Sequence, residues 1–429
     1  MNKAVEEQLA YLKKGCVDVI QEDELRHKIA RSLREKKPLK VKVGFDPTAP
    51  DIHLGHTVVI RKMKHFQDLG HDVVFLIGDF TGLIGDPSGR SATRPAMTHE
   101  DILKNAETYK AQIYKILSPE KTIIDFNSRW LGKLTSFEII KLAAKYTVAR
   151  LLERDDFTKR LKEGLPVSVH EILYPLMQAY DSVALECDVE MGGTDQKFNL
   201  LVGRDIQREF GQEPQIVMTT PLLEGLDGVE KMSKSLGNYV GINEPPKAMF
   251  GKLMSISDPL MYKYYELLTD VPVAQIETWK SEAQAGKINP RDLKAKLARM
   301  VITDFWGADK ARAAAEEFDR IHKNKETPAD LKVHVVSSSS VSGSLTVQPG
   351  EYKVAGERVD LRHTRLLLDI MMELKIFPSR GEAKRVIQQG GVDLDGERID
   401  DINYQVDLAD KKEHILKIGK KRFFKFAVK

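Results

Sequence analysis

Residues 40–77 have the sequence KVKVGFDPTAPDIHLGHTVVIRKMKHFQDLGHDVVFLI. Within them, residues 40–45 alternate and are rich in strand-forming types, and residues 72–77 form a second, continuously apolar strand. Between the two strands, residues 55–69 have the spacing of a helix that Gly70 can end. A strand, a helix and a strand in this order predict a βαβ unit with both strands parallel in one sheet.

Loops 46–54 and 78–91 leave the carboxyl ends of these two strands, where a parallel sheet binds its ligands. Farther along, the pattern from about 98 to 210 is mostly helical, and a short strand at 215–219 precedes a loop rich in Gly and Lys. The sequence therefore predicts an α/β fold whose site lies at the ends of its strands.

The chain has 429 residues, enough for about three domains of roughly 150 residues each. Its 42% apolar and 30% charged residues are typical of a folded globular protein and exclude a disordered chain or a coiled-coil fibre. No apolar run reaches the roughly 20 residues of a membrane helix, and acidic residues precede the first hydrophobic stretch, so we expect no membrane partner and a cytoplasmic location. Cys16 and Cys187 lack the paired spacing of a metal or redox motif, and no resident metal site is predicted.

Composition also divides the chain into domains. Residues 1–240 form the predicted α/β domain with an inserted helical segment, and residues 241–325 form a helical domain with prolines near its helix starts. A flexible linker rich in Ser is expected over 326–358, followed by a small α+β domain over 359–429.

The small C-terminal domain carries the excess of positive charge. The net charge is +3, and residues 359–429 alone hold 15 Lys and Arg against 12 Asp and Glu. A predicted helix in this domain places Arg380, Lys384 and Arg385 on one side, where phosphate could meet several cations at once. A solvated helix face would give the same pattern, so charge alone leaves both interpretations open.

Two histidines stand where the first predicted helix begins, in the stretch His53-Leu54-Gly55-His56. Gly55 permits close approach of the backbone, and the amide groups and dipole of a helix start attract phosphate, so ATP is the expected ligand. The structural alternative is that both imidazoles are satisfied by backbone carbonyls.

Two lysines three residues apart occur in Lys231-Met232-Ser233-Lys234-Ser235, between Gly225 and Gly237. Such a loop can move, and its lysines can reach successive phosphates of a triphosphate. A loop of this composition is most often only solvated, but its combination with the histidine pair after a βαβ unit is highly specific.

The two motifs resemble the signatures of class I aminoacyl-tRNA synthetases, and the surrounding sequence resembles tyrosyl-tRNA synthetases of bacterial type. The resemblance extends along nearly the whole chain and includes Gly-Phe-Asp-Pro-Thr-Ala at 44–49, Gly-Leu-Ile-Gly-Asp-Pro-Ser-Gly at 82–89, Gln-Ala-Tyr-Asp at 178–181 and Gly-Gly-Thr-Asp-Gln at 192–196. The C-terminal domain resembles the small RNA-binding domain of that family, which is named after a ribosomal protein.

The resemblance implies a Rossmann-like catalytic domain that activates L-tyrosine with ATP, releases pyrophosphate and transfers the tyrosyl group to the 3′ end of tRNA(Tyr). Mg²⁺ is expected on the departing pyrophosphate. The resemblance also implies a homodimer, with the helical stretch 130–165 as its interface, and no DNA partner.

Individual residues receive roles from the same resemblance. The implied catalytic groups are His53, His56, Lys231 and Lys234. The implied ATP contacts are Gly55, Lys231, Ser233, Lys234 and, at the ribose, Asp195. The implied tyrosine contacts are Tyr174, Gln178 and Asp86 at the ammonium group, Asp46 on the same side, Asp181 at the phenol hydroxyl and Gln196 near the carboxylate. The implied tRNA contacts of the tail are Arg380, Lys384 and Arg385.

The spacing of the pocket residues and two departures from the family pattern bear on the hydroxyl site. Tyr174, Gln178 and Asp181 are four and three residues apart, so one helix face would present all three. Many bacterial relatives have a tyrosine where this chain has Lys42, which cannot accept a hydrogen bond when charged. Pro175 biases Tyr174 toward an extended conformation and could shift or kink the helix start.

Two other functions compete with this interpretation. The same chemistry could serve a tryptophan enzyme or a nucleotidyltransferase, but Asp181 and the tail domain both oppose that assignment. A catalytically silent RNA-binding regulator would show damaged motifs, whereas both motifs are intact here.

Overall fold

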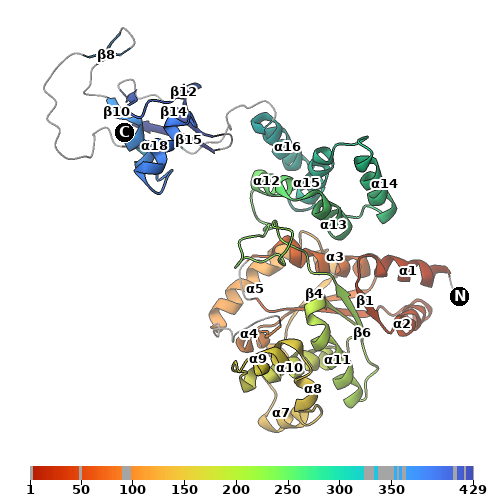
Figure 1. The fold of residues 1–429 in the computed structure, drawn as a ribbon. Helices are drawn as coiled ribbons and strands as arrows, with labels where there is room; N and C mark the ends of the chain where they lie inside the picture. Colours follow the sequence, from red (N-terminus) through yellow and green to blue (C-terminus); the bar gives the residue numbers. More distant parts are fainter. Residues whose placement is uncertain are drawn as a thin grey trace. The chain divides into compact units, whose positions relative to one another are not determined.

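The computed structural model describes residues 3–47, 51–88, 98–322, 333–336, 352–354, 357–359, 364–408, 413–419 and 422–428. The chain forms two compact units, Met1–Ala315 and Glu316–Lys429 (Figure 1). Of the motif residues, Thr48, Ala49 and Gly89 lie outside the described residues, as does most of the linker predicted over 326–358.

The first unit is built on a six-stranded sheet with the order β1-β6-β5-β2-β3-β4. Its strands are β1 (Asp18–Ile20), β2 (Lys40–Phe45), β3 (Asp72–Ile77), β4 (Thr122–Phe126), β5 (Val189–Gly193) and β6 (Ile216–Thr220). β1 pairs antiparallel with β6, and all other neighbours are parallel, which confirms the predicted Rossmann-like sheet.

The strand order reverses direction next to β2. From β2 the chain adds β3 and β4 on one side, and later β5 and β6 on the other. Loops that leave neighbouring strands at such a reversal diverge and open a crevice, which is where doubly wound sheets bind ligands. The site is therefore expected at the ends of β2 and β5, after Phe45 and Gly193.

Two strands lie within the stretch 98–210, which the sequence pattern indicated as mostly helical. β4 and β5 have five residues each and stand between long helices, so a window wide enough to detect helical periodicity averages over them. Periodicity therefore does not predict β5, although the resemblance assigns Asp195 and Gln196, which follow this strand, to the site.

Helices cover the sheet on both sides. α3 (Leu54–Asp68) packs on β2, β3 and β5, while α10 (Val169–Leu185) contacts β2 and α11 (Lys197–Glu209) contacts β5 and β6. In Figure 1, α3 lies on one side of the sheet and the pair α10 and α11 on the other. α3 ends before Gly70, whose positive φ of 85° allows the chain to turn into β3.

The remaining helices of the first unit surround this core. They are α1 (Lys3–Lys13), α2 (Glu22–Glu35), α4 (Thr81–Ile84), α5 (His99–Ile113), α6 (Ser128–Leu131), α7 (Ser136–Ala143), α8 (Val148–Leu151), α9 (Asp155–Lys162), α12 (Pro246–Ser255), α13 (Asp258–Leu268), α14 (Val273–Gln284) and α15 (Pro290–Trp306). Proline stands at or next to the start of each of α12 to α15, where its missing N–H has no helical partner to lose. α16 (Ala308–His322) runs from the first unit into the second.

The second unit has a five-stranded sheet with the order β12-β11-β14-β15-β7. Its elements are β7 (Val333–Val336), α17 (Leu367–Glu373), α18 (Arg380–Gln388), β11 (Val392–Leu394), β12 (Glu397–Ile399), β14 (His414–Ile418) and β15 (Arg422–Val428), with the two-stranded pairs β8 (Tyr352–Val354) and β9 (Glu357–Val359), and β10 (Thr364–Leu366) and β13 (Gln405–Asp407). β7 falls in the predicted linker 326–358, yet it pairs parallel with β15.

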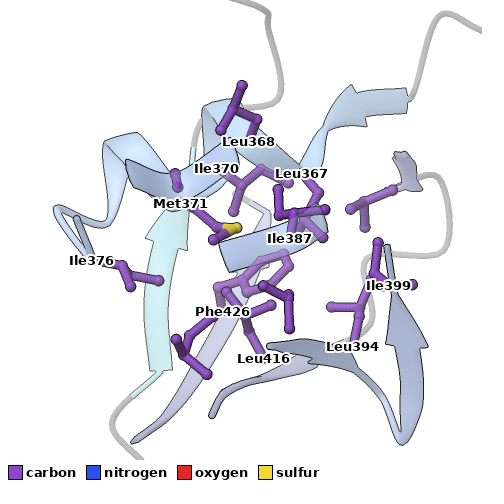
Figure 2. Packing of buried hydrophobic residues seen from close by; sticks show 14 of the residues in the cluster. Leu367, Leu368, Ile370, Met371, Ile376, Ile387, Leu394, Ile399, Leu416 and Phe426 are labelled. Carbon is purple, nitrogen blue, oxygen red and sulfur yellow. The ribbon is translucent and has the colours of Figure 1, made fainter. Parts of the chain in front are cut away.

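The core of this small unit joins its helices to its sheet. Figure 2 shows Met371 of α17 and Ile387 of α18 packed over Leu416 and Phe426, and all four side chains are buried. Burying apolar side chains between two helices and a sheet stabilises the unit. The α+β domain expected from the sequence is thus confirmed.

Candidate active site

A cavity of about 540 Å³ opens at the carboxyl ends of β2 and β5. Every residue of the first unit that the sequence interpretation assigned to the site lines it, namely Asp46, His53, Gly55, His56, Asp86, Tyr174, Gln178, Asp181, Asp195, Gln196, Lys231, Ser233 and Lys234. The fold therefore brings together residues that are far apart in the sequence. Arg380, Lys384 and Arg385 belong to the other unit and lie exposed on α18.

The histidine pair sits at the start of α3. His53 has extended backbone angles as the N-cap residue, and its N–H donates to His56 Nδ1 at 3.2 Å. A Cβ atom at Gly55 would lie 3.0 Å from the His53 ring, so any other residue here would force the imidazole to shift by a few tenths of an ångström.

Both imidazoles are uncharged at neutral pH. Burial lowers the pKa of His53 to about 2 and that of His56 to about 4, and the charge of Lys234 contributes to both shifts. His53 Nδ1 is buried and has no hydrogen-bond partner within the part of the chain that the structure describes. The pair can thus offer neutral ring nitrogens to a ligand.

The lysine loop, residues 231–235, lines the cavity close to the start of α3, where a Cβ atom at Gly55 would lie 3.5 Å from Met232 Cβ. Lys231 Nζ lies 3.3 Å from Asp195 Oδ2, and Lys234 Nζ lies 3.9 Å from Asp51 Oδ2. Burial lowers the pKa of Lys234. Two cations converge here on the space beside the start of α3, an arrangement suited to a polyphosphate.

Asn238 organises the lysine loop, although the sequence interpretation did not identify it. Its Oδ1 accepts from the Ser233 N–H at 2.8 Å, and its Nδ2 lies 3.3 Å from the Lys231 carbonyl oxygen. Met232 anchors the loop with a buried side chain and a backbone hydrogen bond of 2.8 Å to Leu223. An isolated Asn carries no signal that would reveal this role from sequence.

α10 supplies the inner wall of the cavity. It continues through Pro175 from Val169 to Leu185, so the proline neither delays the helix start nor ends the helix. Tyr174, Gln178 and Asp181 consequently share one face that lines the cavity, as their spacing predicted. The Tyr174 hydroxyl donates to Asp46 Oδ2 at 2.9 Å.

Asp181 is a buried carboxylate and not a solvated helix-surface residue, since its side chain is only 3% exposed. Trp130 Nε1 donates to Oδ1 at 2.7 Å and Asn127 Nδ2 to Oδ2 at 3.2 Å. Burial raises its pKa to about 7. Both donors follow the unrecognised strand β4, and no sequence motif marked them.

A chain of hydrogen bonds links Asp86 and Gln196, which line the cavity, to Asn199 and Arg154 behind them. Gln196 Nε2 donates to Asp86 Oδ2 at 2.7 Å, and Asn199 Nδ2 donates to Gln196 Oε1 at 3.1 Å. Arg154, which is 5% exposed, donates to Asn199 Oδ1 at 3.0 Å and to the Ser88 hydroxyl at 2.8 Å. Arg154 is a further residue that the sequence interpretation missed.

Among the residues with described positions, no group of three His, Cys, Asp or Glu side chains is placed to hold a metal ion. None of the described helices is long and apolar enough to cross a membrane. The acidic residues around the cavity are instead engaged by cations, hydroxyls and amides.

Comparison with known proteins identifies the family. The profile for class I tRNA synthetases (W and Y) matches residues 34–323, and the profile for the tyrosine–tRNA ligase SYY-like C-terminal domain matches residues 353–426. A tyrosine–tRNA ligase of Nitratidesulfovibrio vulgaris is 52% identical over 425 residues, covering 99% of both chains. The chain belongs to the tyrosine–tRNA ligase family. Another member, from Geobacter sulfurreducens, is 52% identical over 420 residues, covering 98% of both chains.

Solved structures of this family share the fold of about 72% of this chain. The tyrosyl-tRNA synthetase of Archaeoglobus fulgidus, complexed with L-tyrosine, superposes with a TM-score of 0.60 at 25% identity, covering 72% of this chain and 99% of that one. A truncated mitochondrial tyrosyl-tRNA synthetase of Coccidioides posadasii gives a TM-score of 0.59 at 24% identity, covering 72% and 91%. The family and fold predicted from the sequence are confirmed.

Proposed function

We propose that this chain joins L-tyrosine to ATP, forming tyrosyl-adenylate and pyrophosphate, and then transfers the tyrosyl group to the 3′ end of tRNA(Tyr). Its enzyme class is that of its full-length relatives, tyrosine–tRNA ligase. The observation that carries the proposal is a single cavity that joins a phosphate-binding end to a buried, carboxylate-containing end.

Tyrosine would occupy the end of the cavity formed by α10. Its ammonium group meets Tyr174, Gln178 and Asp86, with Asp46 beside them, and its carboxylate points toward Gln196. Asp181 accepts a hydrogen bond from the phenol hydroxyl. Phenylalanine would leave this buried acceptor without a donor, and an unsatisfied buried polar group is costly.

ATP would occupy the other end, with its ribose at Asp195 and its phosphates between the start of α3 and the lysine loop. In the reaction, a tyrosine carboxylate oxygen forms a bond to the α-phosphorus of ATP. At the same time the bond between the α-phosphorus and the oxygen that bridges it to the β-phosphorus breaks, and pyrophosphate leaves with that oxygen. Lys231 and Lys234 stabilise the negative charge that develops on pyrophosphate. His53 and His56, which are neutral, act as hydrogen-bond donors to the phosphates.

No acid–base group is required in this step, because the attacking carboxylate is already ionised. The protein instead aligns the carboxylate with the α-phosphate and stabilises charge. We infer that Mg²⁺ enters with the ATP phosphates, whose oxygens are the ligands it prefers, and supplies further charge neutralisation on pyrophosphate.

The second unit would hold tRNA, with Arg380, Lys384 and Arg385 on the exposed face of α18 as phosphate contacts. A second copy of the chain would cover the exposed apolar side chains of α7 and α8, among them Phe137 and Ile140, which are 77% and 67% exposed. We place this homodimer in the cytoplasm, where tRNA is charged.

The direct test is ATP–pyrophosphate exchange, with each proteinogenic amino acid offered separately in the presence of Mg²⁺. Exchange with tyrosine alone is the expected result. Exchange with tryptophan would reassign the pocket, and no exchange with any amino acid would favour a silent RNA-binding protein.

A further inference from the structure

A buried ion pair lies behind the inner wall of the cavity. Lys42 of β2 and Glu190 of β5 are direct partners in the parallel register, and each side chain is 1% exposed. Lys42 Nζ lies 3.0 Å from Glu190 Oε1. Burying two charges costs desolvation energy that their attraction does not always offset, so such a pair calls for a specific role.

Lys42 forms hydrogen bonds with the turn of α10 that carries the proposed tyrosine-binding residues Gln178 and Asp181. Its Nζ donates to the Ser182 hydroxyl at 2.8 Å and lies 3.5 Å from the Gln178 carbonyl oxygen. An ammonium group has only three N–H donors, and Glu190 with these two acceptors accounts for all of them. Lys42 therefore does not replace a residue that contacts the phenol hydroxyl, and any effect on tyrosine must pass through α10.

Glu190 fixes the orientation of the Gln178 side chain by accepting a hydrogen bond from its amide. Its Oε1 accepts from Gln178 Nε2 at 3.1 Å, and its Oε2 accepts from the Ser182 hydroxyl at 3.1 Å. The amide nitrogen of Gln178 is thus committed, whereas Gln178 Oε1 is buried and lacks a hydrogen-bond partner among the described residues. This orientation presents an acceptor to a substrate ammonium group.

Lys42 also acts on Asp181 electrostatically. The groups that face Asp181 are Lys42 from β2, Glu190 from β5, Tyr174 on its own helix and the neutral donors Asn127 and Trp130. Burial raises the pKa of Asp181, Lys42 opposes the rise, and the more weakly acting Glu190 adds to it. Of these groups, Lys42 alone is a cation.

We propose that Lys42 is a positioning residue for tyrosine selection, which holds the 178–182 turn of α10 from behind and supplies a positive charge that favours the ionised side chain of Asp181. The proposal rests on the proposed function, in which Asp181 accepts from the phenol hydroxyl. A chain with a charged lysine at this place thus selects tyrosine without a hydroxyl ligand from β2.

The test compares Lys42→Gln with the wild type in tyrosine-dependent pyrophosphate exchange between pH 6 and 9. The acid limb of kcat/KM for tyrosine should move upward by about 1 pH unit, the effect of removing a nearby opposite charge. At pH 7 this is a loss of about fivefold, since about half of Asp181 is ionised there in the wild type, and the loss recovers at pH 9 with the KM for ATP unchanged. The preference for tyrosine over phenylalanine should fall at pH 7.

Lys28→Gln is the matched control, because Lys28 is also a buried lysine, 2% exposed, paired with a carboxylate, Asp188, that immediately precedes β5. It should leave the pH profile unchanged. If Lys42→Gln fails to fold with Glu190 unpaired, the double variant Lys42→Gln/Glu190→Gln removes both charges and should still show an upward, smaller shift.

Profiles of both Lys42 variants that coincide with the wild type, or a Lys28→Gln profile shifted to the same extent, would overturn the inference. The wild type serves to separate the two proposals. If it does not exchange with tyrosine, the proposed function fails; if it does and the Lys42 variants show no shift, only the role of Lys42 fails.

Discussion

Lys231 Nζ lies 3.3 Å from Asp195 Oδ2, so an ion pair links the lysine loop to the residues that follow β5. Asp195 is also the proposed ribose contact, so one carboxylate would both bind the ribose of ATP and hold Lys231 in position. When ATP enters the cavity, Lys231 would already lie beside the ribose site. This relationship underlies the first prediction.

Asp195→Asn should weaken ATP binding while leaving tyrosine binding nearly unchanged. The substitution removes both a charge-assisted contact to the ribose and the ion pair with Lys231, so the KM for ATP should rise about tenfold or more. Pyrophosphate exchange at varied ATP and at varied tyrosine separates the two constants. An equal rise in the KM for tyrosine would contradict the assignment.

Lys234→Ala should slow adenylate formation by about 10²- to 10³-fold, because its charge is needed mainly when pyrophosphate departs. Single-turnover formation of tyrosyl-adenylate measures the rate, and equilibrium dialysis measures tyrosine binding, which should stay the same. Lys121→Ala, at an exposed lysine outside the cavity, is the control for loss of a positive charge. A comparable loss of tyrosine affinity in Lys234→Ala would refute the transition-state role.

Asp181 should make the wild type less stable as pH rises. Its pKa of about 7 in the folded state lies above the ordinary value of 3.8, so the folded state holds the proton more tightly. The stability contributed by protonation is complete below about pH 4 and is lost as pH rises through 7. Between pH 5 and 8 this amounts to roughly 2.5 kcal/mol of unfolding free energy.

Urea unfolding of the wild type and of Asp181→Asn at several pH values measures this effect. The variant has no ionisable group at this position. As pH rises, the unfolding free energy of the wild type should therefore fall relative to that of the variant. Curves that stay parallel between pH 5 and 8 would show that Asp181 is already ionised throughout this range.

Removing the second unit should spare tyrosine activation and reduce transfer to tRNA. The cut belongs after His322, where α16 ends, because a cut at 350 would leave β7 without the strand it pairs with. Exchange activity should remain within about twofold, whereas aminoacylation should fall and lose much of its salt dependence. Unaltered aminoacylation by the shortened chain would show that the unit is dispensable.

Phe137→Asp should convert the proposed dimer into monomers. A carboxylate in place of a side chain that is 77% exposed costs the isolated chain little but would be buried unpaired in a dimer. Sedimentation velocity at several concentrations measures the state of both proteins. Identical sedimentation of variant and wild type would place the interface elsewhere, or show that the chain is a monomer.

Periodicity located the first βαβ unit because its strands are apolar and its helix is long. β2, α3 and β3 lie within one or two residues of the predicted ranges. Periodicity did not predict β4 and β5, because strands this short between long helices are too brief to show a detectable two-residue alternation. The cavity residues could be listed from the resemblance, but Arg154, Asn127 and Trp130 could not, since their roles arise from tertiary contacts.

Lys42 and Pro175 are two residues for which sequence reasoning suggested a disturbance that the structure does not show. Both looked like disturbances of the hydroxyl pocket, yet α10 runs through Pro175, and Lys42 is directed to Glu190 and Ser182 behind the wall. Only the pairing of β2 with β5 reveals a carboxylate opposite Lys42. A long-range partner of this kind leaves no trace in local patterns.

The parallel pairing of β7 with β15 has a consequence for the order of events during protein synthesis. Val333 pairs with Lys425, so β7 leaves the ribosome well before the strand that it needs. Until β15 has been made, neither β7 nor β14 can form that side of the sheet, and both present open edges. A nascent chain that stalls before residue 422 would therefore carry a completed catalytic half and a tail exposed to chaperones and proteases.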